Sequence, residues 1–292
     1  MQIIFGKNGQ LATRLSLLYP NAQVLGHEDV DFSQLDQVSN WEPPAGVKVI
    51  FNCAAYTQVD KAEEQREMAL NINAEAPGIL ARKCAKLGIS FIHISTDYVF
   101  DGKKKEQGWV EVDSTSPVNF YGQTKLLGEE MVLKSRCHGL VVRTSWVFGG
   151  PSKNFVDTML ALAMDREELN IVNDQFGCPT FASDLARAIE NIVEGPHFNS
   201  DAMDIIHITN QNWCSWKLLA DHVFKTAFKR GWPLKLKSVH GVASDQYPTP
   251  AVRPHWSVLS DEKLRSKYNI QMQSWQSAVE SYLSEKQVPI AK

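Results

Sequence analysis

The residues from Gln2 to Ala12 read Gln-Ile-Ile-Phe-Gly-Lys-Asn-Gly-Gln-Leu-Ala, and they decide the fold. The first four form a short apolar run typical of a buried strand, and leucines at helical spacing follow the turn. Gly6 permits a tight turn, Gly9 lets the backbone approach a pyrophosphate at the helix N-terminus, and Ala12 lets helix and strand pack closely. A strand, a glycine-containing turn and a helix in this order indicate a dinucleotide-binding site.

Strands and helices continue to alternate along the chain. Apolar runs predict further strands at residues 22–25, 47–51, 89–94, 139–144, 169–172 and 205–208, and helical spacing predicts helices at 61–87, 183–193 and 216–228. We therefore predict an α/β fold, a Rossmann-type doubly wound parallel sheet with a smaller C-terminal substrate lobe. Residues 1–150 form the expected dinucleotide-binding core. Residues 151–292 form the expected mixed α/β lobe, part of which returns to the core.

A hydroxyl, a phenol and an ammonium converge in the predicted sheet. The strand at 89–94 leads into Ser95 and Thr96 at its carboxyl end, where open α/β sheets bind ligands. Tyr121 and Lys125 are four residues apart in a segment that reads as a helix from about Pro117 to Arg136, so both lie on one helix face.

This arrangement suits reduction of a carbonyl group. A free phenol titrates near ~10, and a nearby ammonium favours the phenolate, so we expect Lys125 to lower the pKa of Tyr121. Tyr121 can then give its proton to a carbonyl oxygen while hydride reaches the carbon, with Thr96 hydrogen-bonding the same oxygen. The same spacing recurs at Tyr282 and Lys286, which we interpret as an exposed helix face.

The second predicted strand ends near Glu28 and Asp29, about where a dinucleotide fold keeps its ribose-reading acid. An acid there would favour NAD, yet Lys7 and Arg14 could reach a 2′-phosphate, and the two acids could equally be loop charges. The choice between NAD and NADP stays open at this point.

Two further residues have alternative roles. Trp146 follows the strand at 139–144 and either walls a substrate pocket or fills the core. Arg253 either holds a diphosphate through charge-assisted hydrogen bonds or forms a surface ion pair.

Composition narrows the partners. A net charge of -3 with mixed signs argues against nucleic acid or an anionic membrane surface as the main partner. No apolar run approaches the ~20 residues that cross a bilayer, and the N-terminus has no signal-peptide pattern, so we expect a cytoplasmic protein. The five cysteines are widely spaced without a Cys-x-x-Cys pair, which predicts reduced thiols and no metal site.

With these residues in view, the chain resembles the extended short-chain dehydrogenase/reductases, and within them the dTDP-4-dehydrorhamnose reductase family. The motifs that carry the resemblance span most of the chain, in order: Gly6-x-x-Gly9-Gln10-Leu11, Asn52-x-Ala54-Ala55-Tyr56-Thr57-x-Val59-Asp60, Ser95-Thr96-Asp97-Tyr98-Val99-Phe100-Asp101-Gly102, Tyr121-Gly122-x-Thr124-Lys125, Arg143-Thr144-Ser145-Trp146, Asn154-Phe155-Val156 and Asp174-Gln175-x-Gly177-x-Pro179-Thr180.

The resemblance implies roles for individual residues. The implied catalytic trio is Thr96, Tyr121 and Lys125. The implied cofactor-binding residues are Gly6, Asn8, Gly9, Gln10, Leu11, Ala54, Ala55, Tyr56, Tyr121 and Lys125. The implied substrate-binding residues are Thr57, Val59, Thr96, Trp146, Asn154 and Arg253. The implied reaction is reduction of the 4-keto group of a nucleotide-linked 6-deoxy-4-ketohexose, giving dTDP-rhamnose, with NADPH, or with NADH as a possibility, in a homodimer.

One departure and two rival functions follow from the same resemblance. Relatives tend to show Arg-Pro-x-Asn-Ser where this chain has Arg253-Pro254-His255-Trp256-Ser257, which bears on the choice of substrate. A sugar-nucleotide epimerase-reductase would need an extra acid/base pair, for which Cys178 and His255 are the candidates. A non-catalytic cofactor-binding subunit, resembling the regulatory subunit of methionine adenosyltransferase, would not need the trio, so its presence favours an enzyme.

Overall fold

The computed structural model describes residues 1–198 and 202–289. Six parallel strands form the central sheet in the order β10-β5-β4-β3-β1-β2. Their bounds are Gln2–Phe5 (β1), Gln23–Leu25 (β2), Val49–Asn52 (β3), Ser90–Thr96 (β4), Gly139–Thr144 (β5) and Met203–His207 (β10). The order reverses beside β1, as in a doubly wound sheet, so the predicted fold class is confirmed.

Both faces of the sheet are covered because successive apolar side chains of each strand point to opposite sides. Ile4 packs with the helices on one face, and Ile3 and Phe5 pack with those on the other. The first group of helices comprises α1 (Gln10–Leu18), α8 (Ala182–Val193) and α10 (Glu262–Tyr268). The second comprises α2 (Leu35–Asn40), α5 (Ala76–Leu87) and α6 (Phe120–Lys134).

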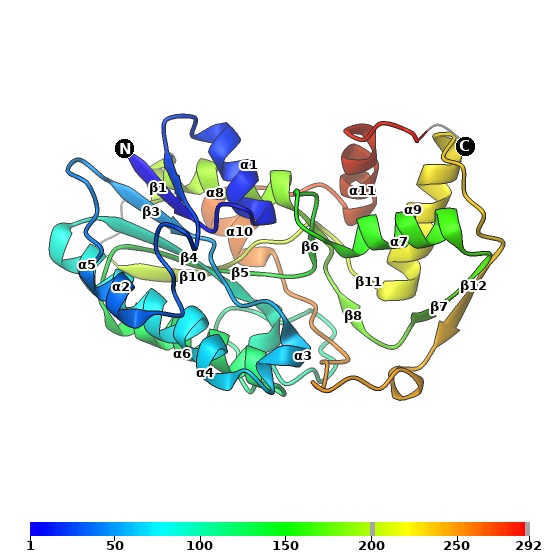
Figure 1. The fold of residues 1–292 in the computed structure, drawn as a ribbon, viewed down its shortest axis with the longest axis horizontal. Coiled ribbons are helices and arrows are strands. Elements are labelled where there is room, and N and C mark those ends of the chain that lie inside the picture. Colours follow the sequence, from blue (N-terminus) through cyan, green and yellow to red (C-terminus); the bar gives the residue numbers. More distant parts are fainter. Residues whose placement is uncertain (199–201, 290–292) are drawn as a thin grey trace.

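A second apolar cluster lies beyond the sheet, on the right of Figure 1. Its elements are α7 (Phe155–Asp165), β7 (Glu168–Val172), α9 (Trp216–Lys229), β12 (Ser238–Val242) and α11 (Trp275–Ser284), with β7 and β12 paired in parallel. Short strands join this lobe to the sheet side: β6 (Val147–Phe148) pairs with β9 (Thr180–Phe181), and β8 (Phe176–Gly177) pairs with β11 (Cys214–Ser215). The chain leaves the sheet for this lobe and returns to it for α8, β10 and α10.

The helix predicted at residues 61–87 is confirmed from Arg66 onward, whereas its first turn is wrong. A separate short helix, α3 (Val59–Ala62), precedes it, and α4 (Arg66–Leu70) continues through a π-helical turn at Asn71–Glu75 directly into α5. The side chain of Asn73 lies in this turn, accepting a hydrogen bond from the Tyr56 N–H (2.9 Å) and donating to the Tyr56 carbonyl oxygen (3.1 Å). The turn therefore serves to anchor the chain after β3, a typical use of a π-bulge.

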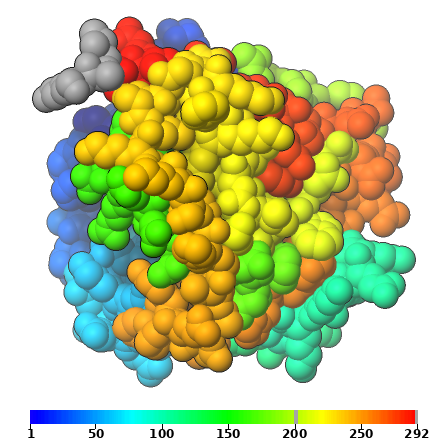
Figure 2. Space-filling model, turned by 90° about the vertical axis from the view of Figure 1, so that its right-hand side faces the viewer, coloured from blue at the N-terminus to red at the C-terminus, as the bar shows by residue number. Residues whose placement is uncertain are grey.

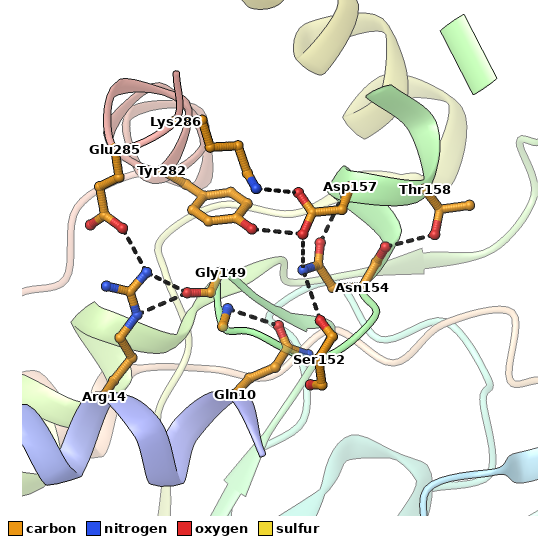
Figure 3. A network of polar contacts seen from close by, with 11 residues as sticks. Gln10, Arg14, Gly149, Ser152, Asn154, Asp157, Thr158, Tyr282, Glu285 and Lys286 are labelled. Atoms are coloured by element: carbon orange, nitrogen blue, oxygen red, sulfur yellow. Dashed lines mark hydrogen bonds and ion pairs between the residues drawn. The ribbon is translucent and has the colours of Figure 1, made fainter. Parts of the chain in front are cut away.

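The interpretation of Tyr282 and Lys286 as an exposed helix face is also wrong. Tyr282 is 3% exposed and belongs to the core of the lobe. Its hydroxyl donates to Asp157 Oδ2 (2.7 Å), and Lys286 Nζ lies 2.8 Å from Asp157 Oδ1 (Figure 3). Within residues 1–198 and 202–289, no helix combines the length and apolarity needed to cross a membrane.

Candidate active site

The three residues of the predicted trio come from two adjacent elements. Thr96 ends β4 at the carboxyl edge of the sheet, and Tyr121 and Lys125 lie in the first turns of α6. The Asn119 side chain starts this helix by accepting a hydrogen bond from the Gly122 N–H (2.8 Å), because the first N–H groups of a helix have no partner within it.

A glycine lets α6 lie against the turn that follows Thr96. A Cβ atom at Gly122 would lie 2.3 Å from the carbonyl oxygen of Tyr98, so any side chain there would push the helix away. The close approach sets Tyr121 beside Tyr98, with the two rings edge to face and their centroids 5.8 Å apart.

Lys125 is buried, and among residues 1–198 and 202–289 no carboxylate lies in hydrogen-bond contact with it. Its side chain is 1% exposed, and Nζ donates to the carbonyl oxygen of Ile94 (2.6 Å). Burial lowers the pKa of Lys125 to about 8, while the charges of Glu129 and Cys53 act in the opposite direction. The ammonium therefore sits just under the strand that carries Thr96.

Tyr121 does not behave as the sequence predicted. Burial raises the pKa of Tyr121 to about 12, the hydrogen bond with Thr96 lowers it, and the charge of Asp97 raises it further. The expected lowering by Lys125 is wrong, because desolvation of the phenolate outweighs the charges around it. At neutral pH Tyr121 is therefore a protonated phenol, which is the form that can donate a proton.

Asp97 is a residue of this site to which the sequence reading gave no role. It is 3% exposed, and Oδ1 accepts a hydrogen bond from the Thr96 hydroxyl (3.0 Å), whereas Oδ2 has no partner among the described residues. Burial raises the pKa of Asp97 to about 6, and the nearby hydroxyl groups of Ser257, Thr96 and Ser145 act against this rise. The available signal was a charged residue directly after a buried strand.

A buried ion pair between Arg143 and Glu129 lies next to the site and joins β5 to α6. Arg143 of β5 and Glu129 of α6 are 3% and 1% exposed and form three hydrogen bonds, at 2.9, 3.2 and 2.7 Å. The pair joins the strand next to β4 to the helix that carries Tyr121 and Lys125. Such a pair holds geometry more than it adds stability, because desolvation offsets much of the attraction.

A glycine-lined cleft of about 270 Å³ opens at the carboxyl ends of β1, β2 and β3. Gly6 has a left-handed backbone (φ +95°), and a Cβ atom there would lie 2.9 Å from the Ala54 nitrogen. The predicted cofactor residues Gly6, Asn8, Gly9, Ala54 and Ala55 all line this cleft. Lys7, considered above as a partner of a 2′-phosphate, lines it too, and so do residues that the sequence did not indicate: Gly26, His27, Asp31, Phe32 and Cys53.

The other predicted cofactor residues of these loops lie elsewhere. Leu11 is 6% exposed in the core, and Tyr56 is 6% exposed with its hydroxyl bonded to Gln65 (2.7 Å). The side-chain amide of Gln10 donates to the Val147 carbonyl oxygen (3.0 Å) and accepts from the Gly150 N–H (3.3 Å). Figure 3 shows Gln10 directed toward the loop that contains Gly149. Its side chain therefore holds the loop after β5 against α1.

Glu28 and Asp29, the two acids considered as partners of the cofactor ribose, both bond to neighbouring protein groups. Glu28 Oε1 lies 2.8 Å from Lys7 Nζ, and both side chains are nearly half exposed. Asp29 Oδ2 accepts a hydrogen bond from the Gly26 N–H (2.8 Å). Arg14 donates to the Gly149 carbonyl (2.8 Å) and pairs with Glu285 (2.6 Å), so it is directed toward α11 (Figure 3).

A wide cleft of about 1050 Å³ runs between the lobe and the sheet side. Its wall combines aromatic and aliphatic side chains of the lobe with charged groups: Phe155, Met159, Leu162, Trp216, Tyr247, Arg166, Asp60 and Arg253. Of the six predicted substrate residues, Arg253 lies in this wall. The contents of the wall suit a ligand with a flat apolar end and an anionic part.

Trp146 and Asn154 have structural partners. Trp146 has a left-handed backbone (φ +48°) and stacks on Trp216, with ring centroids 3.4 Å apart, so it backs a residue that lines the wide cleft. The Asn154 side chain caps α7 by accepting from the Asp157 N–H (3.0 Å) and donates to Asp157 Oδ2 (2.8 Å).

The two candidates for an extra acid/base pair differ in environment. Cys178 is 2% exposed, and burial raises the pKa of its thiol to about 12. His255 lines the wide cleft, with its ring Nδ1 3.0 Å from the Asp174 carbonyl oxygen. Trp256, the residue that departs from the family motif, is 4% exposed and packs with Cys178 and Val258.

Comparison with known proteins finds matches that span nearly the whole chain and carry the same family name. The model of the RmlD substrate binding domain matches residues 1–288. The chain is 38% identical over 293 residues to a dTDP-4-dehydrorhamnose reductase of Escherichia coli K12, which covers 97% of both chains. It is 38% identical over 289 residues to the enzyme of the same name from Burkholderia thailandensis, covering 95% of this chain and 96% of the relative.

Solved structures agree over the whole length. A dTDP-4-dehydrorhamnose reductase ortholog from Clostridium acetobutylicum superposes with a TM-score of 0.88 at 34% identity, covering 98% of this chain and 99% of that one. The dTDP-4-dehydrorhamnose reductase of Bacillus anthracis, solved in complex with NADP, superposes with a TM-score of 0.89 at 33% identity and the same coverage.

Proposed function

This chain belongs to the dTDP-4-dehydrorhamnose reductase family, and from that premise we propose that it is an oxidoreductase that reduces the 4-keto group of dTDP-4-dehydrorhamnose with NADPH, giving dTDP-rhamnose. The observation that carries the proposal is the meeting of Thr96, protonated Tyr121 and buried Lys125 at the carboxyl edge of the sheet. Carbonyl reduction needs a proton donor at that place.

The residues around the glycine-lined cleft fit a dinucleotide. Gly6 leaves no room for a side chain against Ala54, and Gly9 starts α1 without a side-chain cap, so backbone N–H groups of its first turn can receive a pyrophosphate. Gly6, Asn8, Gly9, Ala54 and Ala55 would hold the cofactor there. When bound, NADPH supplies the hydride that reduces the carbonyl carbon.

Tyr121 and Thr96 act on the oxygen of the same carbonyl group. The Tyr121 hydroxyl gives its proton to the oxygen as negative charge develops on it. The single proton of the Thr96 hydroxyl is directed to Asp97 Oδ1 (3.0 Å) in the structure, and on substrate binding this hydroxyl would turn from Asp97 to donate to the carbonyl oxygen. The Lys125 ammonium stabilises the phenolate that remains on Tyr121 after the proton has left.

Arg253 is the proposed partner of the substrate diphosphate. It lines the wide cleft, and the residue before it, Val252, accepts a hydrogen bond (2.8 Å) from Asn119, which caps the helix of Tyr121. A nucleotide sugar in the wide cleft could therefore extend from the lobe toward the trio, with its diphosphate near Arg253.

A homodimer and a cytoplasmic location complete the proposal and rest on the resemblance to the family. Neither nucleic acid nor a membrane is proposed as a partner, since the chain carries a net charge of -3 with mixed signs. Sedimentation of the purified protein as a monomer would remove the dimer from the proposal.

Loss of reduced-nicotinamide absorbance tests the reaction directly. The purified protein is mixed with dTDP-4-dehydrorhamnose and, in separate reactions, with NADPH or NADH. We expect turnover, faster with NADPH. Absence of turnover with both cofactors, although the protein binds NADPH, would overturn the proposal and direct attention to another nucleotide sugar or to a regulatory role.

A further inference from the structure

Arg253 is joined to Asp60 by a two-point ion pair in the wall of the wide cleft. Nη1 donates to Asp60 Oδ1 (2.5 Å), and Nη2 donates to Oδ2 (2.7 Å). Nη1 also donates to the Ala251 carbonyl oxygen (2.8 Å), and the Ala251 N–H donates to Asp60 Oδ1 (3.1 Å). Both side chains line the cleft, with 20% of Arg253 and 38% of Asp60 exposed.

This pairing leaves one edge of the guanidinium unused. A guanidinium has five N–H groups, and Asp60 and Ala251 accept from three of them. The remaining two, on Nε and Nη2, have no acceptor in the described part of the chain and lie on the same edge. Two parallel N–H groups on one edge match two oxygens of a phosphate group. The pair with Asp60 is thus compatible with a second anion on Arg253.

The two partners come from segments that are far apart in sequence. Asp60 lies in α3, next to the loop that leaves β3, and Arg253 is 193 residues later in the segment that crosses from the lobe back to α10. Figure 2 shows the orange segment around residue 250 lying against the light blue segment around residue 60, at the lower edge of that face.

The crossing segment is also tied to the catalytic helix. The Asn119 side chain, which caps α6, donates to the carbonyl oxygen of Val252 (2.8 Å). The position of Arg253 is therefore set from two sides, by Asp60 at its guanidinium and by Asn119 at the preceding residue. Without Asp60, the long side chain would keep its charge but lose its fixed plane, and ordering it on binding would cost entropy.

We propose that Asp60 is a positioning residue for substrate recognition: it holds the guanidinium of Arg253 so that its free edge receives the diphosphate of a nucleotide sugar. This inference rests on the proposed function. The alternative role for Asp60 is inhibitory: its carboxylate would neutralise the Arg253 guanidinium and compete with the diphosphate for it. The free edge favours positioning, because the anion can be bound without displacing the carboxylate.

The test compares Asp60→Asn with the wild-type protein in binding two probes, dTDP and thymidine, by titration calorimetry. We expect roughly tenfold weaker binding of dTDP and less than about twofold change for thymidine, since the lost contact concerns the diphosphate alone. The KM for dTDP-4-dehydrorhamnose should rise by a similar factor, with kcat nearly unchanged. Unchanged or tighter dTDP binding by Asp60→Asn would overturn the inference.

Two further variants separate positioning from loss of folding. Asp221→Asn makes the same chemical change in an ion pair with Lys217, and Asp221 is similarly exposed (37%) but lies outside the cleft wall. It should bind dTDP as the wild type does. In an Arg253→Lys background, which lacks the fork, Asp60→Asn should have no added effect on dTDP, whereas additive losses would contradict a role that acts through Arg253.

The same data distinguish failure of the inference from failure of the proposed function. A wild-type protein that turns over dTDP-4-dehydrorhamnose while Asp60→Asn binds dTDP equally well rejects only the positioning role. A wild-type protein that neither turns over this sugar nor binds dTDP rejects the proposed function, and the inference with it.

Discussion

Two tyrosine–lysine pairs with identical spacing occupy opposite ends of this molecule. Tyr121 and Lys125 lie in α6, and Tyr282 and Lys286 lie in and just after α11. Tyr121 is partly buried and Tyr282 is 3% exposed, and desolvation raises the pKa of each phenol. Sequence spacing and the direction of the pKa shift therefore do not distinguish the pair with proposed catalytic roles from the pair without them.

The partners of the polar ends distinguish the two pairs. Tyr282 and Lys286 both end on Asp157, as Figure 3 shows, so the hydroxyl proton and the ammonium are already committed to one carboxylate. Lys125 ends on a neutral carbonyl oxygen, and the group that lowers the pKa of Tyr121 is the Thr96 hydroxyl rather than a charged partner. A pair that lacks its own anion keeps a proton and a positive charge for a substrate.

Removing each phenolic hydroxyl tests the comparison most strongly. Tyr121→Phe should lower kcat for dTDP-4-dehydrorhamnose by about 10²–10⁴-fold, the usual contribution of a general acid, while NADPH binding is retained. Tyr282→Phe should keep kcat within about twofold of wild type. Steady-state rates and a fluorescence titration with NADPH measure both. A Tyr121→Phe protein with more than about a tenth of wild-type turnover would contradict the assignment.

The two lysines should differ in how stability responds to pH. Because the pKa of folded Lys125 is about 8 and its ordinary value is 10.5, the unfolded chain binds more protons between these values, so this residue makes the unfolding free energy rise with pH. Relative to Lys125→Met, the wild type should gain about 3 kcal/mol from pH 8 to 10.5. Urea unfolding at several pH values measures this gain.

Lys286→Met is the matched control for that experiment. Burial acts to lower the pKa of Lys286, but Asp157 and Tyr282 outweigh it and hold the pKa above its ordinary value of 10.5. The folded and unfolded chains therefore bind the same number of protons at Lys286 between pH 8 and 10, and Lys286→Met should run parallel to wild type there. If the unfolding free energy of Lys125→Met also ran parallel to that of the wild type, Lys125 could not be a buried ammonium with a lowered pKa.

The shared carboxylate should give the smallest effect of the three. Asp157→Ala leaves the buried Tyr282 hydroxyl without its acceptor and should lower the unfolding free energy by about 2 kcal/mol in urea titrations. Asp157→Asn retains an oxygen that can accept from Tyr282 and should lose less. If both variants were as stable as wild type, the contacts with Asp157 in Figure 3 would not be what holds Tyr282 and Lys286 in place.

Much of the fold could be predicted from local patterns. Parallel strands buried on both faces read as continuous apolar runs, and five of the six sheet strands follow runs in the first 144 residues. The strand at 205–208 was predicted as well, but its place at the edge of the sheet beside β5 depends on where the returning chain finds an unpaired strand. The predicted helix at 61–87 begins at Arg66 instead, and its π-helical turn was not predicted, because the Asn73 side chain bonds the backbone of Tyr56, a contact that periodicity does not report.

The parts of the candidate site that could be predicted are those in which a residue and the motif that indicates its role lie in one short segment. The glycines, the Thr96 turn and the Tyr121–Lys125 spacing are local, and they do meet at one sheet edge. The protonation state of Tyr121 was not predictable, because the amount of protein enclosing the phenol decides whether desolvation or the nearby ammonium prevails.

The sequence by itself determined which segments form strands and helices, the dinucleotide turn, and the motifs that identify the family. Only the tertiary structure decided which of the two tyrosine–lysine pairs is committed to a carboxylate, and that Arg253 is held by Asp60. The physical reason is distance along the chain: Asp157 lies 125 residues from Tyr282, and Asp60 lies 193 residues from Arg253. Hydrogen bonds and charges act over a few ångströms, and only folding brings such partners within that range.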